Sequence, residues 1–135
     1  MAQKSLETKK IAFRILDKIF NVGDFFVVDE TCSRDIIVHV PGIAGDLKGI
    51  EAFKEFIKNF HEAFTAIHLH VDDMHVEGDM VDVHATITAN NVGPFYEIAA
   101  AQKEVTMEPS FFFKFNSDGK VVELWQEIDT TSLMR

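Results

Sequence analysis

The sequence has few of the residues that build covalent cross-links or metal centres. Its only cysteine, Cys32, excludes an internal disulfide bond and a zinc site made of several cysteines, and inert packing is the simplest role for it. No apolar run approaches the roughly 20 residues that a membrane-spanning helix needs. Glycine-rich phosphate loops and serine nucleophile motifs are missing too, so nothing indicates nucleotide hydrolysis or a serine triad.

Positive charge is scarce as well. The sequence has 13 lysine and arginine residues against 22 aspartate and glutamate residues, which gives a formal net charge of -9. Because there is no basic stripe to neutralise phosphates, the chain is not expected to bind nucleic acid or an anionic membrane surface. The first ten residues, MAQKSLETKK, are polar and show no signal peptide, and we therefore expect a soluble, cytoplasmic protein.

Phenylalanine is abundant, in contrast to the other aromatic residues. The chain has 13 Phe but one Trp and one Tyr, among 135 residues of which 47% are hydrophobic. A chain of this length is expected to form one domain over residues 1–135, and it shows no internal repeat or linker. So many aromatic side chains without polar groups indicate either a thick core or an apolar cavity.

The first half of the chain shows helical spacing. Residues 5–22 carry isoleucine at four-residue steps and are expected to end as a helix at Gly23, with a short second helix after Asp24. Residues 42–48 read as a loop. The pattern is clearest over residues 50–64, where one apolar stripe predicts a helix. The residues of this stripe are Ile50, Phe53, Ile57, Phe60 and Phe64.

The second half shows the two-residue spacing of strands. It predicts strands over residues 67–76 and 80–88, joined by a turn, and a long final hairpin over 105–129. Residues 90–103 between them read as a loop or a short helical excursion, and one strand, over 35–40, lies among the helices. This order predicts an α+β fold, a curved antiparallel sheet with helices packed on its concave face.

The last predicted strand carries the unusual polar groups. If it has no bulge, Trp125, Glu127 and Asp129 lie on one side of it. A carboxylate beside apolar side chains can act as a general acid/base, since burial raises its pKa toward neutrality. The candidate pocket wall consists of Trp125, Met107, Phe111 and Phe113. The alternatives are core packing for these side chains and a strand-end hydrogen bond for Asp129.

Three segments resemble the SnoaL-like branch of the NTF2-like superfamily. They are GIEAFKEF starting at Gly49, VEGDMV starting at Val76, and GKVVELWQEID ending at Asp129. The last of them is the most specific, and the resemblance spans nearly the whole chain in the right order. His39, which precedes a loop, also matches a histidine often found at that place in the family.

The resemblance implies one NTF2-like domain: a cone-shaped, curved antiparallel β-sheet with N-terminal helices packed on its concave face. It also implies an apolar pocket, a homodimer, and polyketide-cyclase-like intramolecular aldol chemistry on a small carbonyl-bearing molecule, without metal or cofactor. The acid/base carboxylate of the family corresponds to Asp129, with His39 as a second catalytic candidate. Glu127 is expected at the pocket rim. Asn91 stands where members often carry histidine, and it can bind substrate but cannot transfer protons.

Two other functions stay open from the sequence. One is a non-catalytic, small-ligand-binding module, and the other is proton transfer of the ketosteroid-isomerase type, for which the only tyrosine, Tyr96, lies in a loop. His68, His70 and His84 resemble a set of metal ligands. However, strand alternation places them opposite the apolar residues, on the outer face of the sheet, and no metal is expected.

Overall fold

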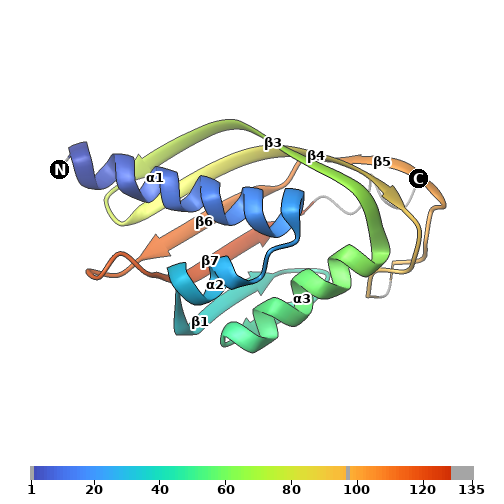
Figure 1. The fold of residues 1–135 in the computed structure, drawn as a ribbon, viewed down its shortest axis with the longest axis horizontal. Coiled ribbons are helices and arrows are strands. Elements are labelled where there is room, and N and C mark those ends of the chain that lie inside the picture. The colour runs from blue at the N-terminus through green and yellow to red at the C-terminus, as the bar shows by residue number, and fades with distance from the viewer. Residues whose placement is uncertain (1, 97, 129–135) are drawn as a thin grey trace.

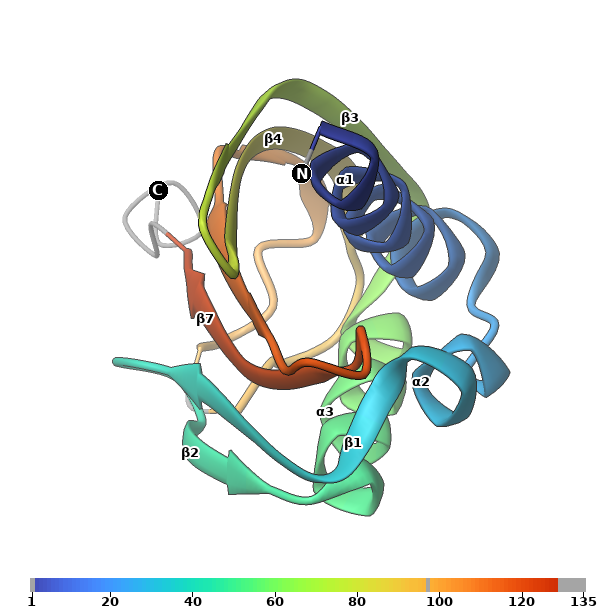
Figure 2. The ribbon, with the colours of Figure 1, turned by 90° about the vertical axis from the view of Figure 1, so that its left-hand side faces the viewer.

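Helices cover the concave face of one strongly curved β-sheet (Figures 1 and 2). The computed structural model describes residues 2–96 and 98–128. Seen end-on, the sheet curls around the helices as an open cone, and its two edge strands do not meet (Figure 2). This arrangement confirms the predicted α+β layout. Among the described residues, no helix is long and apolar enough to span a membrane.

The helices lie where the apolar spacing predicts them, although their ends differ. Helix α1 covers Ala2–Leu16 and continues into one segment of π-helix, η1, over Asp17–Val22. Gly23 ends this segment with a φ of 79°, a left-handed conformation that glycine adopts without strain. Helix α2 covers Phe26–Thr31, and helix α3 covers Ile50–Ala63.

The described residues contribute seven strands to the sheet. The strands are β1 (Cys32–Val40), β2 (Gly45–Lys48), β3 (Phe64–Glu77), β4 (Met80–Asn91), β5 (Lys103–Met107), β6 (Ser110–Phe115) and β7 (Val121–Glu127). Their order across the sheet is β2-β1-β7-β6-β4-β3, and β5 pairs with β4. All pairs are antiparallel except β1 with β7, which run parallel.

Two details of the strands differ from the prediction. The segment predicted as a loop over residues 42–48 contains the short edge strand β2, which lacks the alternating pattern because it is mostly exposed. The final hairpin also begins later than predicted, because Pro109 separates β5 from β6. Proline has no N–H for the ladder, but its carbonyl accepts a hydrogen bond from the N–H of Ala85 at 3.1 Å.

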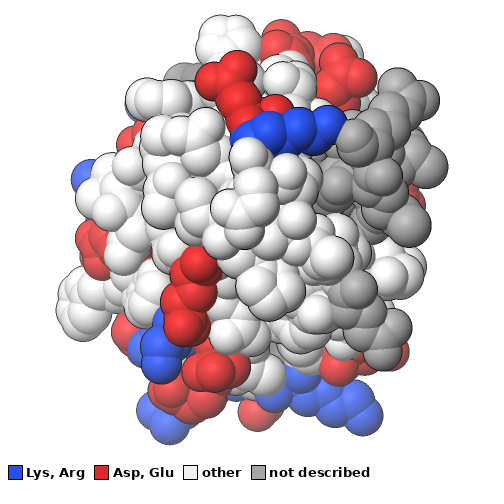
Figure 3. Space-filling view, turned by 90° about the vertical axis from the view of Figure 1, so that its right-hand side faces the viewer, with Lys and Arg blue, Asp and Glu red and all other residues white. Residues whose placement is uncertain are grey.

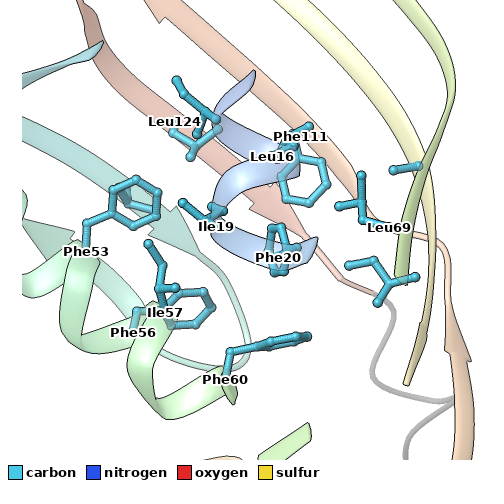
Figure 4. Packing of buried hydrophobic residues seen from close by; sticks show 14 of the residues in the cluster. Leu16, Ile19, Phe20, Phe53, Phe56, Ile57, Phe60, Leu69, Phe111 and Leu124 are labelled. Atoms are coloured by element: carbon cyan, nitrogen blue, oxygen red, sulfur yellow. The ribbon is translucent and has the colours of Figure 1, made fainter. Parts of the chain in front are cut away.

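The core lies between α1, α3 and the concave face of the sheet. Side chains of Phe53, Phe56, Ile57 and Phe60 on α3 point toward those of α1, η1, β6 and β7 (Figure 4). The Phe60 ring lies 5.1 Å from the ring of Phe20 and 4.5 Å from that of Phe64, measured between centroids. Such aromatic pairs add about 0.5–1.5 kcal/mol each beyond their burial. The abundant phenylalanines therefore build a thick core.

Candidate functional site

A β-bulge in the final hairpin decides which side chains of β7 face the core. Phe115 pairs with Val121, but Lys114 pairs with Glu123, so one extra residue on β7 shifts the register. Phe112 consequently lies opposite Trp125, and Phe111 lies opposite Gln126. Because directly opposed residues share a face, Trp125 and Phe111 lie on different faces of the sheet.

This register corrects the predicted pocket wall. Phe111, Phe113 and Met107 are buried in the core on the concave side, whereas Trp125 is half-buried on the outer face. The prediction that Trp125 lines one surface with the other three is therefore wrong. Without the bulge, an unbroken hairpin would have placed Trp125 opposite Phe111, which is the arrangement that simple alternation predicts.

Outside the cone, His39 is held between two carboxylates. Its Nδ1 lies 2.7 Å from Oδ1 of Asp46 on β2, and its Nε2 lies 2.6 Å from Oε2 of Glu123 on β7. The ring stacks on the indole of Trp125 at a centroid distance of 5.2 Å and an interplanar angle of 21°. Each ring nitrogen faces one carboxylate, and both nitrogens can donate a hydrogen bond at the same time only when the imidazole is protonated. The arrangement thus favours an imidazolium, and the catalytic role of His39 stays a prediction.

The pH dependence of stability should report this arrangement. The hydrogen bond with Glu123, reinforced by Asp46, raises the pKa of His39 above its usual value of 6.5 against the opposing effect of burial. Because the pKa of His39 is higher in the folded state than in the unfolded state, protonated His39 stabilises the fold. This stabilisation is complete at pH values below the unfolded-state pKa, and it is lost as the pH rises through the folded-state pKa. We expect the unfolding midpoint of the wild type to fall, relative to that of His39→Gln, as the pH rises above about 6.5, the usual histidine pKa.

Thermal unfolding followed by circular dichroism across this range measures the difference. His70→Gln is the matched control, because the His70 side chain is 82% exposed and pairs only weakly with Asp72. Its profile should follow that of the wild type. Parallel profiles for the wild type and His39→Gln would show that His39 contributes nothing to the pH dependence.

Asn91 is a structural residue, which corrects its predicted contact with substrate. Its side chain is 2% exposed at the end of β4. Nδ2 donates to the carbonyls of Ala63, at 3.2 Å, and Gly93, at 2.9 Å, and Oδ1 accepts from the N–H of Ala101 at 2.5 Å. Both amide hydrogens are therefore used by the backbone. Asn91 joins the end of α3 to both ends of the segment that follows β4.

The first part of that segment, residues 92–96, packs against α3. The N–H groups of Val92 and Gly93 both donate to the carbonyl of Ala63, which satisfies one of the free carbonyls at the helix end. Phe95 is buried against the rings of Phe56 and Phe60. The segment is a packed wall at this end of the molecule, where Figure 3 shows a broad uncharged surface with charged groups mainly near its edges.

A shallow cavity of about 330 Å³, largely open to solvent, lies on the surface where β7 ends. It is lined by Pro41, Glu108, Ser110, Glu127 and Ile128. Glu127 is exposed and lies opposite Ser110 in the sheet, which agrees with its predicted place at a rim. A second cavity, of about 510 Å³, lies at the start of α3 among exposed charged residues and shares no lining residue with the first. The first cavity is the better candidate site, because it adjoins the most specific sequence motif.

Apart from the Cys32 thiol, no ionisable side chain is buried among the described residues. The buried polar side chains belong to Thr8, Thr31, Asn91 and Gln126, none of which titrates near neutral pH. Burial raises the pKa of the Cys32 thiol to about 11, which agrees with its predicted inert role. Asp129, the first catalytic candidate, lies outside the described residues, so its role stays a prediction.

The predicted histidine set does not assemble. His68 and His70 are exposed on the outer face, as predicted, but His84 lies in register with Asp73 and not with either of them. His84 instead contacts Ser110, with 2.9 Å between Nδ1 and Oγ. Among residues 2–96 and 98–128, no group of three or more His, Cys, Asp or Glu side chains is placed to hold a metal ion.

Sequence reasoning overlooked one buried polar residue near the end of β7, Gln126. Its side chain is fully buried on the concave face, and neither Nε2 nor Oε1 has a hydrogen-bond partner. The alternation of β7 indicates that it faces away from Trp125. A glutamine among apolar inward positions is the signal that would have identified it.

Comparison with known proteins places this fold in a family. The family model for SnoaL-like polyketide cyclases matches residues 10–135. A proposed SnoaL-like polyketide cyclase from Jannaschia sp. CCS1 superposes with a TM-score of 0.85 and 24% identity, covering 96% of this chain and 93% of its own. AclR, a proposed hydroxylase from Streptomyces galilaeus, superposes with a TM-score of 0.80 and 22% identity, covering 96% of this chain and 80% of its own.

An LEH-like epoxide hydrolase from M. tuberculosis shares the fold at a TM-score of 0.73 and 14% identity, with 96% of this chain and 87% of that one covered. No curated protein matches the sequence. At these identities the solved structures show the fold alone, and they confirm the predicted SnoaL-like, NTF2-like architecture. The match of the family model over nearly the whole chain shows that the protein belongs to the SnoaL-like polyketide cyclase family.

Proposed function

We propose that this protein is a cofactor-independent enzyme that performs acid/base chemistry on a small, mostly apolar, carbonyl-bearing molecule. The observation that carries the proposal is the end of β7: the family model extends through it, and a cavity of about 330 Å³ opens beside its last residues. In the sequence, Asp129 comes directly after Ile128, which lines this cavity. Proteins named for several reactions share the fold, so the fold alone does not define the reaction.

The specific reaction is an intramolecular aldol condensation. The Asp129 carboxylate removes a proton from the carbon next to one carbonyl group of the substrate, and the resulting enolate carbon attacks a second carbonyl carbon. A carbon–carbon bond forms, the second carbonyl becomes an alkoxide, and the proton returns to this oxygen from Asp129. No atom or electron is gained or lost, so the reaction needs no cofactor.

Proton exchange at carbon tests the first step. We expect the wild type to incorporate deuterium next to the carbonyl of 2-tetralone in heavy water, as followed by proton NMR, well above the rate in buffer. The probe is an apolar ketone of two rings with acidic α-protons. No acceleration with this and other enolisable ketones would favour the alternative, a binding module without chemistry. The absence of carboxylate and histidine side chains from the described interior is the observation that favours this alternative.

We also propose that two copies of the chain associate through the outer face of the sheet. Phe112 and Trp125 lie opposite each other there and are only half-buried. Light scattering after gel filtration should therefore give twice the chain mass of 15.3 kDa for the wild type, and about the chain mass for Phe112→Lys. Phe26→Lys, at a residue 65% exposed on α2, is the control and should stay dimeric. A wild type of monomer mass would contradict the proposal.

A further inference from the structure

Gln126 carries the most unusual polar group among the described side chains. It is fully buried, and both of its polar atoms lack a hydrogen-bond partner. Its neighbours on the concave face are apolar: Phe111 lies opposite it on β6, and Leu124 precedes it by two residues. Leaving both polar atoms unpaired is unfavourable, because the amide has lost its hydrogen bonds to water. Methionine would fill a similar volume without this penalty, so the amide indicates a role in function.

The position of Gln126 connects it to the cavity at the end of β7. Glu127 and Ile128, the next two residues, line this cavity together with Pro41. Ile128 also packs against the core and is partly buried. On the other side of β7, Val40 directly precedes Pro41 and is fully buried. Gln126 itself does not line the cavity. By strand alternation it lies on the same side of the chain as Ile128, two residues further on, so an apolar ligand that displaces Ile128 would approach the amide from the cavity.

We propose that Gln126 binds the substrate, with the Nε2–H group donating to a carbonyl oxygen and Oε1 accepting from a hydroxyl group of the same molecule. This inference rests on the proposed function. A donor held in an apolar surrounding stabilises the negative charge that develops on the carbonyl oxygen as the α-proton leaves. The amide itself cannot transfer a proton, so it complements the acid/base group.

Two rigid probes that differ only in a carbonyl group test the contact. 9-Fluorenone has the carbonyl oxygen and fluorene lacks it, and equilibrium dialysis measures the dissociation constant of each. We compare the ratio of the two constants in the wild type and in Gln126→Met, because the ratio cancels differences in apolar contact. The ratio should shift by about tenfold in favour of fluorene in Gln126→Met. Leu124→Met, on the same face, is the matched control and should keep the wild-type ratio.

A second measurement needs no ligand. Because Gln126→Met removes an unpaired polar group, its unfolding midpoint should lie about 3–8 °C above that of the wild type. A lower midpoint would show that the amide is satisfied within the free protein and would overturn the argument. Gln126→Leu replaces the methionine variant in both measurements if the latter does not fold.

The binding and exchange experiments separate the two proposals. An unchanged ratio in Gln126→Met, or a wild type that binds neither probe, overturns the role of Gln126. A shifted ratio together with no deuterium exchange retains Gln126 as a ligand-binding residue and overturns the proposed enzymatic function. Deuterium exchange with an unchanged ratio retains the enzyme and overturns this inference.

Discussion

Asp129→Asn is expected to lower the rate of deuterium exchange into 2-tetralone by roughly 10²–10⁴-fold, the usual contribution of a general base. Asparagine keeps the size and shape of the side chain but cannot accept a proton near neutral pH. The described interior contains no buried carboxylate or histidine that would replace it. The unfolding midpoint should change little, so the loss will separate chemistry from folding.

Asp118→Asn is the matched control for this experiment. Asp118 is exposed in the turn between β6 and β7, where Asn116 Oδ1 accepts hydrogen bonds from the N–H groups of Asp118 and Lys120. The same change of charge at this distant place should leave exchange unaffected. Exchange that persists in Asp129→Asn would show that another group removes the proton. His39, between Glu123 and Asp46, would then be tested next by His39→Gln.

The largest effect on stability is expected for Asn91→Asp. The substitution keeps the acceptor for the Ala101 N–H but replaces both N–H donors with a carboxylate oxygen that faces the carbonyls of Ala63 and Gly93. Losing two buried hydrogen bonds and adding a buried charge should cost about 3 kcal/mol or more. For a domain of this size, this lowers the unfolding midpoint by about 10 °C.

Asn90→Asp is the control. It makes the same chemical change as Asn91→Asp, and Asn90 is exposed on the same strand. Its midpoint should stay within about 2 °C of the wild type. A stable Asn91→Asp with weakened binding of 9-fluorenone would instead restore Asn91 to the substrate contacts that its sequence position suggests. The two outcomes can be told apart because only the substitution of a structural residue lowers the stability of the ligand-free protein.

Local patterns were sufficient for most of the fold. The apolar stripe of α3 faces the core through Phe53, Ile57 and Phe60, because helical spacing brings these residues onto one side whatever they pack against. Gly23 ends η1 for a similarly local reason, its left-handed backbone. The edge strand β2 was missed because exposed strands carry little apolar alternation. The family was also readable from the motif that ends at Asp129.

The sequence by itself thus determined the α+β architecture, most of the helix and strand positions, and the family, because these follow from spacing along the chain. The tertiary structure alone decided which residues share a face. One extra residue on β7 shifts its register with β6, turns Trp125 outward onto His39 and leaves Gln126 opposite Phe111 in the core. A register shift of one residue exchanges the two faces of a strand. The register depends on how two strands pair, and the alternation within a single strand does not specify this pairing.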